Sequence, residues 1–213
     1  KLVSICFTDG RRVKLMSNLS FKFFTDEQMT TPLPVVNGKP IMRIEFNGAE
    51  SKQGVLYFGS PLLGRQLTVQ AASTDINVKL NVAETNQAWQ ASKPVLSGQI
   101  KQPENGFMYR ATKGGTTGTT APAWPTTPDM AVDDGTTRWV NIGKAFDMSE
   151  FKLASSEAGL TSGLTVLNLP ATINSGTAIP VWFKATNTDA YLRSDATDPI
   201  IRIQINKVTE KAV

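Results

Sequence analysis

The sequence predicts a mainly β protein built as a β-sandwich, and three observations lead to that fold class. Short runs of alternating apolar and polar residues recur along the chain, for example over residues 41–46 and 76–82, and a period of two is typical of half-buried strands. Turn sequences such as Asn47-Gly48 separate these runs about every ten residues, as in sandwiches and barrels. No long amphipathic helix is indicated in the sequence.

The first hundred residues predict a series of short strands. These strands cover residues 1–7, 11–16, 19–24, 41–46, 54–58, 66–70 and 76–82. Asn37-Gly38 precedes the 41–46 run and is a second turn signal. Within that run, Met42, Ile44 and Phe46 are expected to face inward, because side chains alternate between the faces of a strand. Residues 83–91 are compatible with a short helix.

The last seventy residues continue the same pattern. Strands are predicted over residues 164–169, 179–185 and 200–208. Pro180 stands near the start of the second of these, where a missing backbone donor is tolerated. Between the strands we expect a helical turn around residues 148–151 and a turn-rich link over residues 172–177.

Residues 102–142 differ in composition from the rest of the chain. Aromatic runs at residues 107–111 and 137–140 enclose a segment rich in Gly, Thr and Pro that holds Trp124. Prolines at this density fix φ and remove backbone donors, so neither a helix nor a central strand is expected there. Asp134-Gly135 predicts a tight turn. The stretch therefore predicts a small β-hairpin with a long, stiffened loop that presents a tryptophan.

The composition argues against catalysis. Histidine is absent, which removes the commonest general base and the commonest metal ligand. Asp133 and Asp134 are adjacent at a turn, and this favours a role in shaping the turn over an acid/base pair across a cleft. We predict a protein that is not an enzyme and that needs no cofactor and no metal.

The charge distribution and the apolar runs indicate which classes of partner are not expected. The 22 basic and 18 acidic residues give a net charge of +4 and are scattered, so no patch for nucleic acid is indicated. No apolar run approaches the length of a membrane span, and no signal peptide is recognised in the given sequence. The single cysteine, Cys6, lies in an apolar run and is expected to be a buried thiol of a strand. We expect no nucleic acid and no membrane among the partners.

A series of short patterns runs through residues 102–142: Tyr-Arg-Ala-Thr, Gly-Thr-Thr-Gly, Pro-x-Trp-Pro and Asp-Gly-Thr-x-x-Trp. The residues that form it are Tyr109, Arg110, Ala111, Thr112, Gly115, Thr116, Thr117, Gly118, Pro122, Trp124, Pro125, Asp134, Gly135, Thr136 and Trp139. The series resembles a short module common in bacteriophage tail fibres, baseplate parts and head decorations. That module is similar to the small chitin-binding-type carbohydrate modules.

A looser resemblance lies nearer the end of the sequence. Its residues are Leu167, Leu169, Pro170, Ser175, Gly176, Pro180, Val181, Trp182 and Phe183. They are similar to immunoglobulin-like β-sandwich segments of phage tail and baseplate proteins. The resemblance implies an immunoglobulin-like or jelly-roll-type sandwich with the small β-hairpin module inserted.

These observations predict three parts. Residues 1–100 form an N-terminal β-sandwich part, residues 101–143 the Gly/Thr/Pro-rich β module, and residues 144–213 an immunoglobulin-like β part. Two arrangements stay open for the last part, since it either forms a sandwich of its own or completes the first one.

The resemblances imply a structural protein of a phage virion, in the tail or baseplate or at the periphery of the head. Such a protein is made in the cytoplasm of the host bacterium and assembles on a lattice with tail, baseplate or capsid subunits, as an expected homo-oligomer. The alternative is a carbohydrate-binding module or adhesin that recognises a host surface glycan by aromatic stacking.

The candidate glycan-binding residues are Trp124, Tyr109 and Trp139. Tyr109 and Trp139 are expected to lie opposite each other on the hairpin, where packing as the core of the module is the favoured interpretation, because so small a unit needs a core. For Trp124, packing and binding are about equally favoured. Trp89 and Trp182 are assigned to packing in the larger domain.

Overall fold

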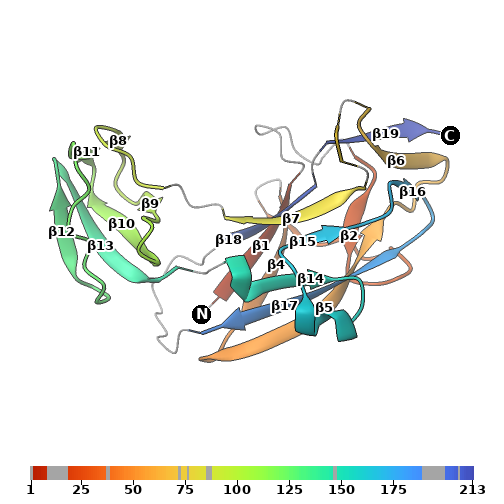
Figure 1. Ribbon diagram of the computed structural model, residues 1–213, viewed down its shortest axis with the longest axis horizontal. Helices are drawn as coiled ribbons and strands as arrows, with labels where there is room; N and C mark the ends of the chain where they lie inside the picture. Colours follow the sequence, from red (N-terminus) through yellow and green to blue (C-terminus); the bar gives the residue numbers. More distant parts are fainter. Residues whose placement is uncertain are drawn as a thin grey trace.

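The computed structural model describes residues 2–8, 19–36, 39–71, 73–75, 77–84, 88–145, 148–188, 200–205 and 207–213. Regular structure in these ranges is nearly all β, as predicted, and includes two short 3-10 helices, η2 (Met148–Glu150) and η3 (Ala158–Ser162). The strand expected over residues 11–16 and the turn at Asn37-Gly38 lie outside the described residues. Figure 1 shows a larger β body and a smaller β module at one end of it.

Three sheets make up the body. The first has the strand order β15 (Val166–Asn168), β7 (Lys79–Glu84), β18 (Ile200–Ile205), β1 (Leu2–Thr8), β4 (Lys39–Glu45) and β3 (Val35–Val36). The second has the order β14 (Phe151–Ala154), β17 (Ile179–Asn187), β5 (Glu50–Gly59) and β2 (Lys22–Phe24). The third, smaller sheet has the order β16 (Thr172–Asn174), β6 (Arg65–Val69) and β19 (Val208–Ala212). Neighbouring strands are antiparallel except β1 and β18, which are parallel.

The sheets share one apolar core, which confirms the predicted sandwich. Alternate side chains of β17, such as Val181 and Phe183, are buried, as the two-residue period of a strand requires. Phe58 of β5 packs against the rings of Phe21 and Phe23, with ring centroids 6.2 and 5.0 Å apart. Each such buried side chain contributes about 1.5–3 kcal/mol relative to exposure to water.

Strands from the two ends of the sequence alternate within these sheets. β17 pairs with β5 along its whole length, from Ile179 opposite Phe58 to Asn187 opposite Glu50. β18 lies between β1 and β7. The strands after residue 144 therefore complete the sandwich begun by the first hundred residues, which decides between the two arrangements that the sequence left open.

Three local expectations differ from the structure. Residues 88–90 have no helical structure, and β7 continues as a strand to Glu84. The strand expected over residues 200–208 is divided between β18 and β19, which join different sheets, and Lys207 before β19 has φ 55°. The link over residues 172–177 contains β16, which pairs with β6. For β7, β16, β18 and β19 the partner strand, rather than the local pattern, determines the structure.

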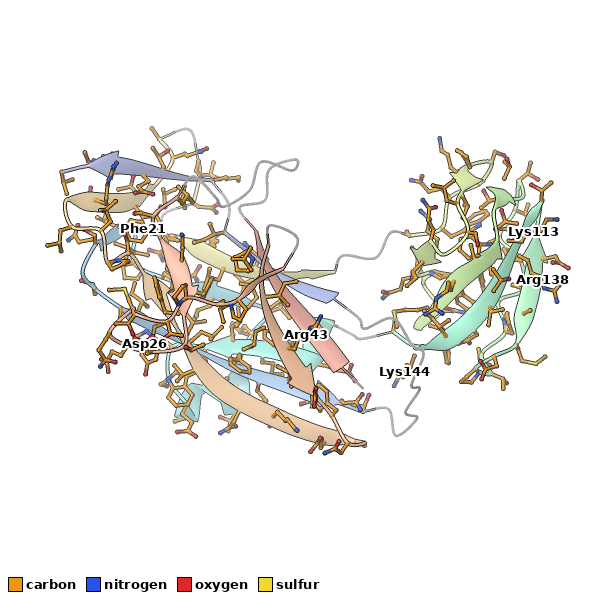
Figure 2. The ribbon with its side chains drawn as sticks, turned by 180° about the vertical axis from the view of Figure 1, so that it is seen from behind. Phe21, Asp26, Arg43, Lys113, Arg138 and Lys144 are labelled. Atoms are coloured by element: carbon orange, nitrogen blue, oxygen red, sulfur yellow. The ribbon has the colours of Figure 1, made fainter. Side chains whose placement is uncertain are left out.

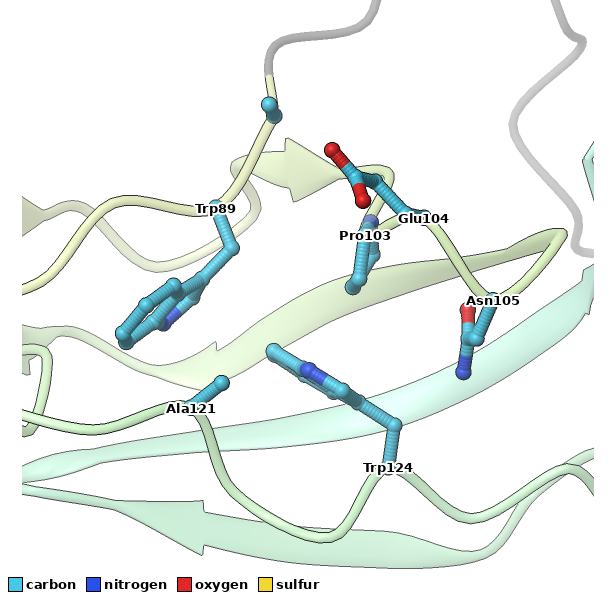
Figure 3. A pocket seen from close by; sticks show the side chains of 7 residues that line it. Trp89, Pro103, Glu104, Asn105, Ala121 and Trp124 are labelled. Atoms are coloured by element: carbon cyan, nitrogen blue, oxygen red, sulfur yellow. The ribbon is translucent and has the colours of Figure 1, made fainter.

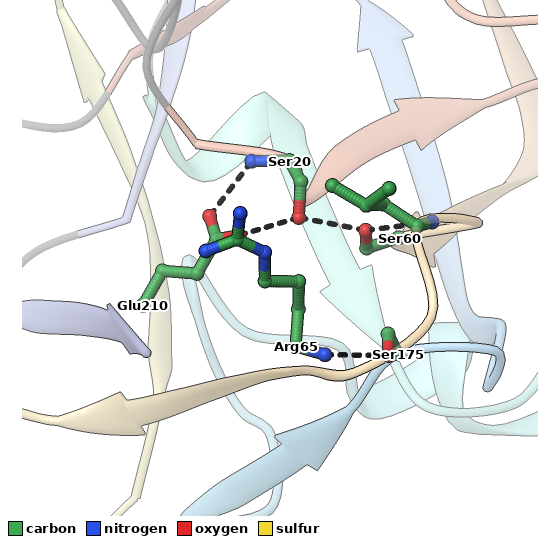
Figure 4. A network of polar contacts seen from close by, with 6 residues as sticks. Ser20, Ser60, Arg65, Ser175 and Glu210 are labelled. Carbon is green, nitrogen blue, oxygen red and sulfur yellow. Dashed lines mark hydrogen bonds and ion pairs between the residues drawn. The ribbon is translucent and has the colours of Figure 1, made fainter. Parts of the chain in front are cut away.

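A polar network ties the strand ends of the body together (Figure 4). Glu210 of β19 accepts hydrogen bonds from the backbone N–H and the hydroxyl of Ser20, at 2.7 and 2.6 Å. The hydroxyl of the fully buried Ser60 donates to that of Ser20 at 2.7 Å. Arg65 Nε lies 3.9 Å from Glu210 Oε1. The network joins the segment before β2, the end of β5 and the last strand.

The module is built from six strands. Its main sheet has the order β12 (Ala131–Asp134), β13 (Thr137–Lys144), β10 (Phe107–Lys113) and β9 (Ile100–Lys101), and β8 (Pro94–Val95) pairs with β11 (Gly115–Thr116). The module thus includes residues before position 101, where the sequence analysis placed its boundary. Among the described strands, none of the module pairs with one of the body. Figure 2 shows Lys113 and Arg138 on the module and Phe21 within the body.

Candidate functional site

The predicted hairpin forms the centre of the module. β10 and β13 pair antiparallel, with Ala111 opposite Trp139, and β12 extends the sheet beyond them through the tight turn at Asp134-Gly135. Gly135 has φ 61°, and a Cβ at this position would collide with the carbonyl oxygen of Thr116. Glycine meets both requirements, since it tolerates positive φ and has no Cβ.

Tyr109 and Trp139 form the core of the module, as the favoured interpretation of the sequence holds. They do not lie opposite each other as expected, because the register of the hairpin places Tyr109 opposite Asn141 and Trp139 opposite Ala111. Both side chains are 0% exposed, so neither ring offers a face to a ligand. The structure brings Trp124 to both of them, with ring centroids 4.4 Å from Tyr109 and 6.0 Å from Trp139. Trp124 is half-buried, and of the three predicted binding residues it is the one with exposed surface.

The hydroxyl of Tyr109 holds the loop that carries Trp124. It donates to the carbonyl oxygen of Pro125 at 3.0 Å and accepts from Asn105 Nδ2 at 2.7 Å. Asn141 Nδ2 donates to the same carbonyl at 2.7 Å. Burial raises the pKa of Tyr109 above its ordinary value, and the hydrogen bond from Asn105 partly offsets this rise. The phenol therefore keeps its donor hydrogen to a higher pH than an exposed tyrosine does.

Asp134 organises the aromatic side chains of the module. Its Oδ2 accepts hydrogen bonds from the indole N–H groups of Trp89, at 2.8 Å, and Trp139, at 2.9 Å. Its Oδ1 accepts from the backbone N–H of Gly118 at 2.7 Å. A Cβ at position 118 would lie 3.0 Å from that oxygen, so glycine permits the close approach. The carboxylate is 3% exposed, and hydrogen bonds of this charge-assisted kind stabilise a buried carboxylate.

The neighbouring carboxylate, Asp133, points to the other face of β12. It is exposed and pairs with Arg138, with Nη1 and Oδ1 3.1 Å apart. Adjacent residues of a strand face opposite sides of the sheet, so Asp133 and Asp134 do not face each other across a cleft.

Thr117, at the centre of the Gly-Thr-Thr-Gly pattern, attaches the segment that carries Trp89. Its hydroxyl donates to the carbonyl of Gln90 at 2.7 Å and accepts from the N–H of Lys93 at 2.9 Å. Its own N–H donates to the carbonyl of Lys93 at 3.0 Å. These bonds, with that from Trp89 to Asp134, place Trp89 in the module and not in the larger domain to which the sequence analysis assigned it.

A cleft of about 470 Å³ opens between Trp89 and Trp124 (Figure 3). Its lining consists of Ala88, Trp89, Pro103, Glu104, Asn105, Ala121 and Trp124. Both tryptophans are half-buried and Glu104 is exposed. Sequence reasoning missed Trp89, because it stands outside the recognised patterns. It also missed the Pro-Glu-Asn-Gly turn at residues 103–106, whose Pro-x-Asn-Gly composition marks a turn.

In the described part of the chain, no three Cys, Asp or Glu side chains gather as they would around a metal ion. None of the helices described is long and apolar enough to cross a membrane.

Comparisons of the chain with protein-family models, with curated proteins and with solved structures found no match. A proposal for its function therefore depends on its own residues and on the geometry described above.

Proposed function

We propose that the chain is a non-enzymatic structural component of a bacteriophage virion, part of the tail or baseplate or a peripheral head protein. Its β body, of immunoglobulin-like or jelly-roll type, attaches to other virion proteins and to copies of itself, and it displays the module outward. The protein is made in the host cytoplasm and resides in the particle. The resemblance of the module to phage virion modules supports this proposal. The residues of that resemblance include Thr117, Gly118 and Asp134, whose hydrogen bonds hold the loops of the module.

The observation that carries the proposal is the division of the molecule into two differing ends. Leu62 and Leu63, which follow β5, are 52% and 77% exposed. The next residue, Gly64, accepts a hydrogen bond from Val213, and Figure 1 places that terminus at the end of the body away from the module. Adjacent exposed leucines suit a protein interface. One end is thus suited to docking and the other to display.

Co-sedimentation with phage particles or empty heads tests the attachment. Wild-type protein is expected to assemble and to co-sediment, and Leu63→Asp is expected to release it, because a charge at an apolar contact is left without a partner. Leu96→Asp is the matched control, since Leu96 is 71% exposed but belongs to the module. A wild-type protein that stays monomeric and never co-sediments would contradict the proposal.

A second function, recognition of a host surface glycan, is favoured by the cleft. Two half-buried indole rings line it together with polar side chains, and pockets of this composition are typical of ligand sites. A glycan array with wild-type protein and Trp124→Ala tests it, with Trp182→Ala as the control because Trp182 is a half-buried tryptophan of β17 in the body. Loss of binding in Trp124→Ala alone is expected. Unchanged binding in that variant contradicts glycan recognition at the cleft.

A further inference from the structure

We propose that the cleft between Trp89 and Trp124 takes an amino sugar, a pyranose unit with a protonated amine, and that Glu104 binds the amine. This inference rests on the proposed glycan recognition and adds the class of sugar. The aromatic walls, the hydrogen-bonding groups and the charge of the cleft each contribute to it.

The walls of the cleft are held in place before a ligand arrives. The indole of Trp89 is fixed by its hydrogen bond to Asp134. The indole of Trp124 packs on Tyr109, and its loop is held by the two hydrogen bonds to the carbonyl of Pro125. Rigid aromatic walls bind at a low cost in conformational entropy. The flat, apolar face of a pyranose ring is a suitable partner for them.

Two groups in the cleft are free to recognise polar edges of a sugar. No described residue accepts a hydrogen bond from the indole N–H of Trp124, and none bonds or pairs with the carboxylate of Glu104. Figure 3 shows both side chains at the cleft. An indole N–H can only donate and a carboxylate can only accept. Trp124 therefore suits a sugar hydroxyl, and Glu104 suits a group with several donor hydrogens.

The charge of the cleft selects an amine among such groups. Glu104 is the one ionisable side chain of the lining, so an acidic sugar would meet a like charge. An ammonium group donates a charge-assisted hydrogen bond to Glu104 and is attracted to the negative faces of the indoles. The chain as a whole carries a net charge of +4, which does not attract cations. Binding of an amine therefore depends on this local carboxylate.

Isothermal titration calorimetry with three oligosaccharides tests the inference. The probes are β-1,4-linked oligomers of glucosamine, of N-acetylglucosamine and of glucose, at a pH where the glucosamine amines are protonated. The wild-type protein is expected to bind the glucosamine oligomer about tenfold more tightly than either neutral oligomer, the size of one charge-assisted contact. Glu104→Gln is expected to remove this preference, and Trp124→Ala to weaken binding of all three.

Asp133→Asn is the matched control for the loss of a negative charge, and it should keep the preference for the glucosamine oligomer. Asp133 is an exposed carboxylate of the module that pairs with Arg138 and does not line the cleft. Glu104 is exposed, so its substitution leaves the fold of the module intact. Equal affinity for the three oligomers, or a preference that survives in Glu104→Gln, overturns the amino-sugar inference and leaves glycan recognition standing. An absence of binding to all three overturns the inference too, whereas attachment to the virion is judged separately by co-sedimentation.

Discussion

The body and the module maintain their folds by different means. The body has a continuous core of Phe, Leu, Ile and Val side chains from both larger sheets. The core of the module is a small group around Tyr109 and Trp139, and the buried carboxylate of Asp134 joins it to the loops. A unit of this size has little apolar area to bury. The comparison teaches that the shape of the module, and of its cleft, depends on the hydrogen bonds of a few polar groups, with the Asp134 carboxylate among them.

The largest effect is expected from a cavity in the body. Phe58→Ala removes a side chain that is 0% exposed and packs on two other phenylalanines, and it should lower the free energy of unfolding by about 3–5 kcal/mol. Hydrogen exchange should show the loss in β5 and β17 and not in β10 and β13. Equal loss of protection in both parts would mean that they unfold as one unit.

The next effect is expected from the carboxylate of the module. The two carboxylate oxygens of Asp134 accept three hydrogen bonds, from Trp89, Trp139 and Gly118. Asp134→Asn replaces one of these oxygens by an NH2 group, which cannot accept, and a buried donor left without an acceptor lowers the free energy of unfolding by about 1–3 kcal/mol. Three of the four tryptophans, Trp89, Trp124 and Trp139, lie in the module, so unfolding followed by tryptophan fluorescence reports mainly on that part. The midpoint of the transition should fall.

Asp133→Asn is the control for that experiment. Asp133 is exposed and pairs with Arg138 at the surface, and such pairs contribute about 0–1 kcal/mol. If the two variants unfold alike, Asp134 does not organise the module.

A smaller effect is expected from the polar network of the body. Glu210→Gln replaces a carboxylate that accepts two hydrogen bonds from Ser20, and the loss of one such bond should lower stability by about 1–2 kcal/mol. Hydrogen exchange of β19 and of the segment before β2 should increase, while the tryptophan fluorescence of the module stays unchanged. A change in module fluorescence would show coupling between the two parts.

The smallest effect is a dependence on alkaline pH confined to the module. Burial raises the pKa of Tyr109 above its ordinary value of 10.0. The unfolded chain therefore loses this proton first. The contribution of Tyr109 to the stability of the module is complete well below pH 10.0 and should be lost as the pH rises from there through the raised pKa. Fluorescence-detected unfolding at increasing pH measures this decline. In Tyr109→Phe, which cannot ionise, the decline should be weaker, and an equal decline would assign it to other groups.

Much of the local structure was predictable because it depends on neighbouring residues. The alternation at residues 76–82 and 179–185 indicated strands, and Val78, Leu80 and Val82 are buried as that alternation requires. Asp134-Gly135 indicated the turn of a hairpin that the structure contains. Period and turn chemistry act over a few residues, so they are visible in the sequence.

Only the tertiary structure decided which distant segments meet. The pairing of β17 with β5 and of β18 with β1 depends on the whole sandwich, since many strands with the same alternation would serve as partners. Trp89 belongs to the module because Asp134 and Thr117 hold its segment there. The sequence alone thus determined a mainly β protein with an aromatic hairpin module, and long-range hydrogen bonds added the second wall of its cleft.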